Sequence, residues 1–66
     1  MLTLMKNQLM IEQYEELLQA SSNDIRLRLK DMQLNISGKD LKVCALTRDE
    51  ILIEGIMEGF TFHHET

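Results

Sequence analysis

The sequence contains no proline or tryptophan, and its only cysteine is Cys44. An intramolecular disulfide is therefore excluded, and a single unpaired cysteine is typical of a reducing compartment. No apolar run approaches the roughly 18 residues that a membrane-spanning helix needs. The N-terminus lacks a continuous apolar segment and a small-residue cleavage site, so it does not resemble a secretory signal. We therefore expect a cytoplasmic protein that does not itself insert into a membrane.

The motifs of common catalytic and nucleotide-binding sites are also absent, including glycine-rich phosphate loops, nucleophile elbows and H-E-x-x-H. His63, His64 and Glu65 are the only group that resembles metal ligands, and their adjacency near the chain end provides no preorganised geometry. Cys44 has no histidine near it in the sequence, so we interpret it as a partly buried structural thiol. We expect no enzyme activity, no catalytic residue, no cofactor and no metal.

Basic residues are outnumbered by acidic ones, 7 to 11, and the net charge is −4. Nucleic acids and anionic membranes both require a basic surface, so the charge argues against general binding to either. The 66 residues make one domain, with an expected core at residues 2–62 and a frayed tail at residues 63–66. A domain of this size buries only about 60% of its unfolded-state surface. Without a disulfide or metal, association with itself or another protein is the remaining source of support.

Short runs in which apolar and polar residues alternate, interrupted by glycine, characterise the chain from residue 34 onwards. This period of two is typical of half-buried strands, and it predicts strands at residues 33–37, 41–45 and 50–57. Ile36 and Leu41 are five residues apart, so an unbroken strand would place them on opposite faces. We therefore predict that Gly38 belongs to a break between two strands.

A second change of parity separates Met57 from Phe60 and Phe62, and it indicates a turn or bulge at Glu58 and Gly59. We interpret three glycines as structural turn residues: Gly38, Gly55 and Gly59. The remaining anomaly in this region is Ile56, an apolar residue at an outward-facing position.

Residues 21–24, Ser-Ser-Asn-Asp, form the clearest predicted turn, because their side chains bond to nearby backbone. The strand that follows alternates apolar residues with Arg26, Arg28 and Lys30. The basic face of this strand is most simply a solvated outer surface with glutamates as cross-strand neighbours. The alternative is a strip that docks an anion or a partner.

Residues 1–20 fit two structures. Good helix formers predominate, glycine and proline are absent, and apolar residues occur at helical spacing. The competing prediction is three short strands at residues 2–5, 9–13 and 16–20. From the residues alone, the helix has a slight advantage.

Apolar and glycine positions recur at fixed spacings along almost the whole chain. Those that carry a resemblance are Leu9-Met10-Ile11-Glu12-Gln13-Tyr14; Leu17-Leu18 followed by Ser21 and Ile25; Leu34-x-Ile36-x-Gly38-x-x-Leu41-x-Val43-x-x-Leu46; and Ile51-x-Ile53-x-Gly55-x-Met57-x-x-Phe60-x-Phe62. Over residues 3–62 this register resembles the YabP/YqfC family of bacterial sporulation proteins, and most closely its YqfC branch. The chain departs from the family pattern at Lys6, Glu16 and the pair Asp31-Met32, where the family often has glycine.

The resemblance implies an all-β domain, a small antiparallel meander or sandwich-like sheet of about six to seven short strands, in which residues 2–20 are strand. It also implies a role in endospore formation, synthesis in the mother cell and a gene often found beside that of a membrane protein of the same process. The resemblance carries no catalytic residues to transfer.

The leading hypothesis is a non-enzymatic sporulation protein that acts through protein–protein contacts, with a sporulation membrane protein or a second copy as partner. The candidate interface residues are Ile56, Phe60, Phe62, Arg26 and Arg28. The alternative hypothesis is a small cytosolic module that binds a ligand or nucleic acid through the strip of Arg26, Arg28 and Lys30.

Overall fold

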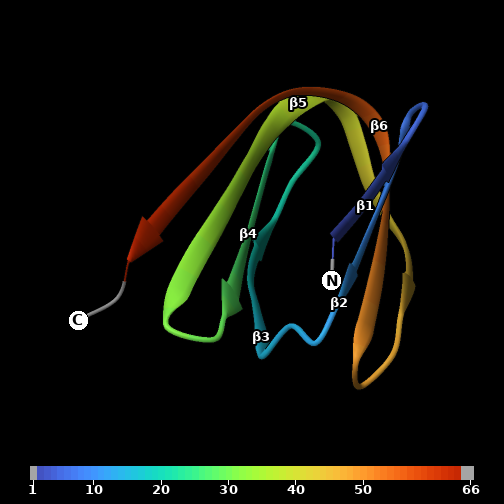
Figure 1. Ribbon diagram of the computed structural model, residues 1–66. Helices are drawn as coiled ribbons and strands as arrows, with labels where there is room; N and C mark the ends of the chain where they lie inside the picture. Colours follow the sequence, from blue (N-terminus) through green and yellow to red (C-terminus); the bar gives the residue numbers. More distant parts are fainter. Residues whose placement is uncertain (1, 65–66) are drawn as a thin grey trace.

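The computed structural model describes residues 2–64, and these residues form six β-strands and no helix. The strands are β1 (Leu2–Met5), β2 (Gln8–Glu12), β3 (Glu16–Ala20), β4 (Asp24–Leu29), β5 (Met32–Leu46) and β6 (Glu50–His64). They pair antiparallel in one sheet, in the order β1-β2-β6-β5-β4-β3 (Figure 1). The predicted all-β antiparallel fold is confirmed, including strands within residues 2–20, and the helix that local propensity favoured there is wrong.

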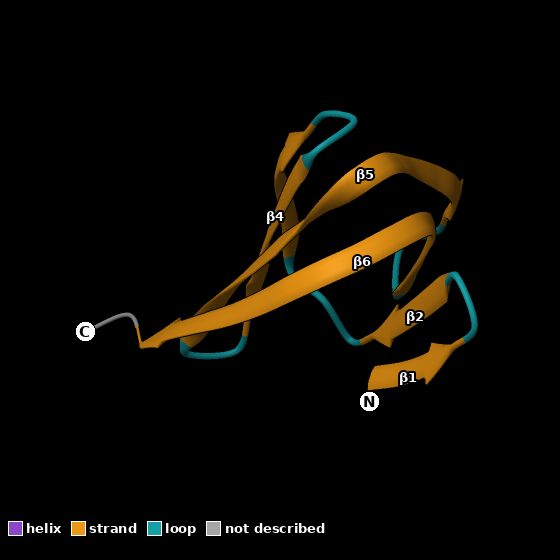
Figure 2. Ribbon diagram, turned by 90° about the horizontal axis from the view of Figure 1, so that it is seen from above, coloured by secondary structure: helices purple, strands orange, loops and turns teal. Residues whose placement is uncertain are grey.

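β5 and β6 are 15 residues long and form a hairpin that bends near its middle, so the two halves of the sheet face each other (Figures 1 and 2). The first half-sheet contains β1, β2, residues 50–54 of β6 and residues 42–46 of β5. The second half-sheet contains β3, β4, residues 32–37 of β5 and residues 59–64 of β6. The bent hairpin is therefore common to both.

Close contact between the two backbones at the bend depends on glycine. A Cβ added to Gly38 would lie 2.0 Å from the carbonyl oxygen of Ile56, and one added to Gly55 would lie 2.6 Å from that of Asp40. Gly55 also has a φ of 134°, a conformation that side chains with a Cβ rarely adopt. The register shifts on both sides of this contact, and Glu58 is left without a partner as a bulge.

The sequence correctly predicted the changes of side-chain parity but not the continuity of the strands. No break occurs at Gly38, because β5 runs through it, and all three glycines lie within strands rather than in turns. The bulge leaves one residue of β6 unpaired in the ladder and thereby turns the apolar side chains that follow the bend inward again. The ladder of backbone hydrogen bonds stays intact on either side of the bulge. His63 and His64 belong to β6 rather than to a frayed tail, whereas residues 65–66 lie outside the described residues.

The core lies between the two half-sheets. Its buried members in the described chain are nine aliphatic side chains: Leu9, Ile11, Leu41, Ile51 and Ile53 from the first half-sheet and the bend, and Ile25, Leu27, Leu34 and Ile36 from the second. All nine lie at the inward-facing positions of strands in which apolar and polar residues alternate. Half-buried Tyr14, Leu17, Leu29, Val43 and Met57 pack around them.

Tight connections and the bend of β5 place residues other than glycine in the left-handed region. Asn7, Gln13, Asp31 and Asp40 have φ values of 60°, 65°, 61° and 53°. Asparagine and aspartate tolerate this conformation better than most residues, whereas a glutamine there is strained. The backbone N–H of Gln13 donates to the carbonyl of Asp49 at 2.7 Å as the chain leaves β2 for the second half-sheet.

Candidate interaction surface

Residues 59–64 of β6, which we call the C-terminal edge, pair with another strand on only one side. They align without interruption with residues 32–37 of β5. β2 covers the other side of β6 only at residues 50–54, and no described strand continues that cover to residues 59–64. In an antiparallel ladder, every second residue of such an edge directs its backbone N–H and C=O groups away from the neighbouring strand. The C-terminal edge is therefore open to strand addition.

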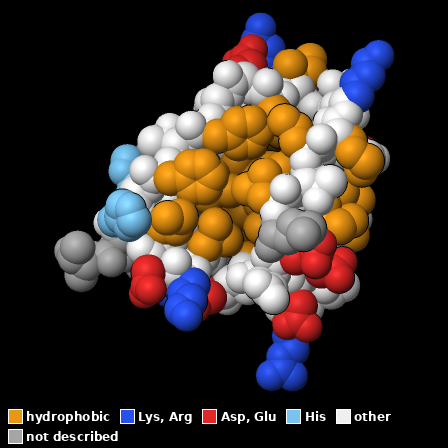
Figure 3. All heavy atoms as spheres, viewed as in Figure 1, with side chains coloured by type: hydrophobic (Ala, Val, Ile, Leu, Met, Phe, Trp, Pro, Cys, Tyr) orange, Lys and Arg blue, Asp and Glu red, His pale blue; other side chains and the backbone are white. Residues whose placement is uncertain are grey.

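Phe60 and Phe62 extend the apolar face of the core onto this edge. Phe60 is directly opposite Ile36, and Phe62 is directly opposite Leu34, so all four side chains lie on the same face of the sheet. Ile36 and Leu34 are fully buried, but Phe60 is 38% exposed and Phe62 is 52% exposed. Figure 3 shows apolar side chains gathered in one area on this face of the molecule, beside the pale blue histidines.

Ile56 does not belong to the same apolar surface. It is 50% exposed and pairs with Lys39 at the bend, whereas the next residue, Met57, packs against the core. Successive strand residues point to opposite faces, so Ile56 is on the outer side of the bend and away from Phe60 and Phe62. The three candidate residues of the last strand therefore occupy two separate surfaces.

Two of the three basic residues of the strip, Arg26 and Arg28 on β4, form ion pairs with carboxylates. Arg28 is opposite Glu16 of β3 and forms an ion pair with it, as the sequence predicted for a glutamate neighbour. Arg26 forms an ion pair with Asp24 at 3.0 Å. Exposed ion pairs of this kind contribute little to stability. They do neutralise the positive charge on the arginines that binding to a phosphate backbone would require. No observation on the described surface favours the ligand- or nucleic-acid-binding alternative.

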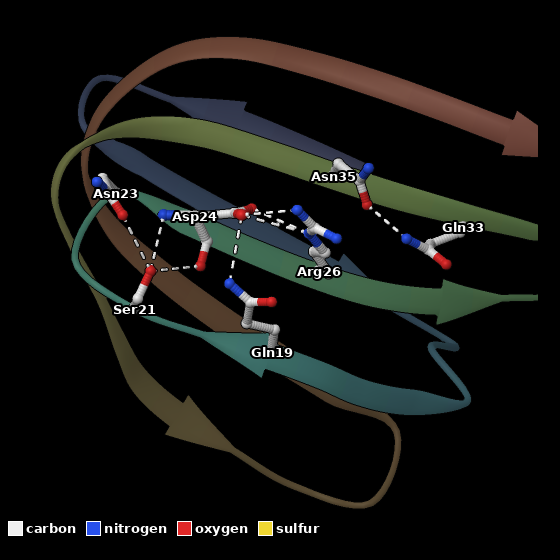
Figure 4. Close-up of polar contacts among 7 residues, drawn as sticks. All are labelled: Gln19, Ser21, Asn23, Asp24, Arg26, Gln33 and Asn35. Atoms are coloured by element: carbon white, nitrogen blue, oxygen red, sulfur yellow. Dashed lines mark hydrogen bonds and ion pairs between the residues drawn. The ribbon is translucent and has the colours of Figure 1, made fainter.

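Polar contacts in the hairpin between β3 and β4 have a structural role. The Ser21 hydroxyl lies 3.1 Å from Asn23 Oδ1 and accepts a hydrogen bond from the backbone N–H of Asp24 at 3.1 Å (Figure 4). The Asp24 carboxylate accepts hydrogen bonds from Gln19 and Arg26. These groups bond mainly to one another, as expected of a turn held by side-chain to backbone bonds.

Comparison with known proteins places the chain in a family. The model of the YabP family matches residues 2–66. The chain belongs to the YabP family. It is also 44% identical over 48 residues to a Bacillus subtilis protein described as uncharacterized protein YqfC. That match covers 73% of this chain and 52% of the relative, so the chain spans about half the length of the curated protein it matches. No solved structure matches.

Membership of the YabP family is consistent with a role related to sporulation. The structure also accounts for one departure from the family pattern noted above. Asp31, at a position where the family often has glycine, adopts a φ of 61° in the turn between β4 and β5. Aspartate is among the residues that tolerate this conformation, so the turn is kept without glycine. Across residues 2–64, no helix is long and apolar enough to cross a membrane.

Cys44 of this YabP-family chain is exposed, not partly buried as expected. Ile53 pairs with Val43 and Leu52 pairs with Ala45, so Cys44 is the extra residue of a bulge in β5. Desolvation raises the pKa of the thiol, and the neighbouring Glu54 carboxylate raises it further. A raised pKa disfavours the thiolate form that nucleophilic chemistry needs.

The pKa of the Glu54 carboxyl shifts in the opposite direction and is lowered. The hydrogen bond that Gln8 Nε2 donates to its carboxylate at 3.0 Å lowers the pKa of Glu54, and a hydrogen bond from Cys44 lowers it further. This contact ties β2 to β6 across the first half-sheet.

His63 and His64 lie on β6, and within residues 2–64 no group of three histidine, cysteine, aspartate or glutamate side chains could hold a metal. Glu65 lies outside the described residues.

Sequence reasoning did not assign Leu2 and Leu4 to a surface. They are opposite Ile11 and Leu9 in the register of β1 and β2, and they are 40% and 55% exposed. They therefore extend the core face onto β1, as the two phenylalanines do onto β6. Their shared parity was a usable signal, but the competing helical pattern of residues 1–20 obscured it.

Proposed function

We propose that this chain is a non-enzymatic protein of endospore formation that acts through protein–protein contacts in the mother cell. Family membership supports the link to sporulation. The observation that carries the contact-based mechanism is the C-terminal edge, where Phe60 and Phe62 leave apolar surface in water beside unpaired backbone groups. A surface of this kind is typical of strand addition by a protein partner.

The proposal also assigns the protein to the mother-cell cytoplasm, where contact with a sporulation membrane protein would bring it to a membrane without insertion. This partner follows from the resemblance described above. The charge of −4 supports a protein partner over nucleic acid.

The proposal is tested by replacing Phe60 and Phe62 together with serine in the chromosomal gene of the native host. We expect a marked fall in heat-resistant spores at normal protein level, and a pull-down from sporulating cells that no longer recovers the parent's partner. The matched control is Leu46→Ser, because Leu46 is 54% exposed but lies at the far end of β5. Normal spore formation after deletion of the whole gene would contradict the role in sporulation.

A different result is expected if the protein acts in sporulation but the C-terminal edge is not its interface. If the gene deletion blocks sporulation and the double serine variant does not, the protein acts in spore formation through another surface. Immunoblotting for equal protein level separates a lost contact from a lost fold, since both phenylalanines are substantially exposed.

A further inference from the structure

The described sheet has other exposed edges, and each has a feature that opposes strand addition. β1 is only four residues long and is followed by Lys6. β3 contains a bulge and the ion-paired Glu16. Residues 42–46 of β5 include Lys42 and the bulge at Cys44. Short length, charge and bulges are the features by which natural sheets keep their edges from pairing with other chains.

Residues 59–64 themselves have none of these features, although the bulge at Glu58 directly precedes them. The C-terminal edge is six residues long, continuous in register with β5, and contains no lysine, arginine, aspartate, glutamate or proline. Its outward face is also uncharged: Gly59, Thr61 and His63 alternate with the two phenylalanines, and they neighbour Ser37, Asn35 and Gln33 of β5. A second strand could therefore approach without meeting a like charge.

The sequence of the edge is complementary to itself when two copies run antiparallel. If Thr61 faces Thr61 of a second copy, Phe60 faces Phe62 of that copy, and Phe62 faces its Phe60. Gly59 then faces His63, which leaves room for the imidazole. Aromatic cross-strand pairs stabilise an antiparallel sheet relative to alanine pairs. One two-fold axis generates all these pairs at once, as a symmetric dimer requires.

We propose that residues 59–63 pair antiparallel with the same residues of a second copy, about a two-fold axis at Thr61, so that the second half-sheet continues across both copies. The dimer satisfies the free backbone groups of both edges and covers part of the exposed phenylalanine surface. This inference rests on the proposed function only in using the same edge as an interface. The contact is small, and interfaces below about 1,000 Å² are typically weak, so we expect a dissociation constant on the order of micromolar.

The test compares one substitution at two edges. Thr61→Lys places a lysine at the proposed axis, directly opposite the lysine of the second copy, where like charges repel. Thr3→Lys makes the same change on β1, where Thr3 is also an exposed strand residue. Sedimentation velocity should show the parent passing from monomer to dimer as concentration rises through the micromolar range, Thr3→Lys behaving like the parent, and Thr61→Lys remaining monomeric.

Several outcomes would overturn the dimer. These are a parent that stays monomeric up to several hundred micromolar by the affinity scale above, a Thr61→Lys variant that dimerises like the parent, and a Thr3→Lys variant that is equally monomeric. Circular dichroism of each variant establishes that the sheet is retained. A monomeric parent together with a sporulation defect of the double serine variant would remove the second copy as the occupant and leave the proposed function intact.

A cysteine scan tests the register independently of charge. In a background with Cys44→Ser, Thr61→Cys should form an intermolecular disulfide under mild oxidation, because residues directly opposite in a pair have Cβ atoms about 4.5–5.5 Å apart. Asn35→Cys, one strand further from the edge, is the matched control and should remain reduced. Equal cross-linking of both variants would contradict pairing through the edge.

Discussion

The two ends of β6 have similar apolar alternation but different surroundings. Ile51 and Ile53 are fully buried, while Phe60 and Phe62 are 38% and 52% exposed, although all four face the inner side of the folded sheet. β2 covers residues 50–54 on the side away from β5, and no described strand covers residues 59–64. An apolar pattern therefore indicates which face of a strand turns inward, but a neighbouring strand determines whether that face is buried.

The largest expected effect comes from breaking the bend that separates these two ends. Gly38→Ala should lower the free energy of unfolding by about 3 kcal/mol or more, because the new Cβ would meet the rigid backbone carbonyl of Ile56. Gly59→Ala is the matched control and should cost less than about 1 kcal/mol. The atom that its Cβ would meet belongs to the Ser37 side chain, which can rotate. Urea denaturation measures both, and equal midpoints would show that the bend does not depend on Gly38.

An intermediate effect should follow from truncating one side chain at each end of β6. Ile53→Ala should cost about 2–5 kcal/mol because it leaves a cavity in a fully buried site. Phe62→Ala removes a larger side chain from an exposed site, and we expect a loss below about 1 kcal/mol. The measurement is denaturation at a concentration low enough to keep the parent monomeric. A larger loss at Phe62 than at Ile53 would mean that the C-terminal edge is covered within a single chain.

The smallest expected effect concerns the point where β2 leaves the covered end of β6. Gln13→Gly should stabilise the domain by about 0.5–1 kcal/mol, because glycine relieves the strain of the left-handed conformation at φ 65°. Asn7→Gly should change stability less, since asparagine tolerates this conformation. Thermal unfolding measures both. A lower melting temperature for Gln13→Gly would show that interactions of the glutamine side chain outweigh the backbone strain.

Local patterns predicted much of the second half of the chain. The alternation at Leu34, Ile36, Ile51 and Ile53 correctly indicated inward positions, since a period of two leaves only two possible assignments of faces. The glutamate neighbour of Arg28 was also expected, and Glu16 occupies that place. Residues 2–20 were ambiguous because a stretch of good helix formers can also be a strand when its partners supply the pairing.

From residue 21 onwards, the sequence by itself determined the strand content, the inward faces and the positions at which parity changes, because these depend on residues that are neighbours along the chain. Only the tertiary structure decided that the glycines lie in a bend of two continuous strands, since that requires the close approach of Gly38 to Ile56. The exposure of Cys44 and Phe62 was decided in the same way. Burial depends on which strand lies alongside, and the order β1-β2-β6-β5-β4-β3 places neighbours together that are distant in the sequence.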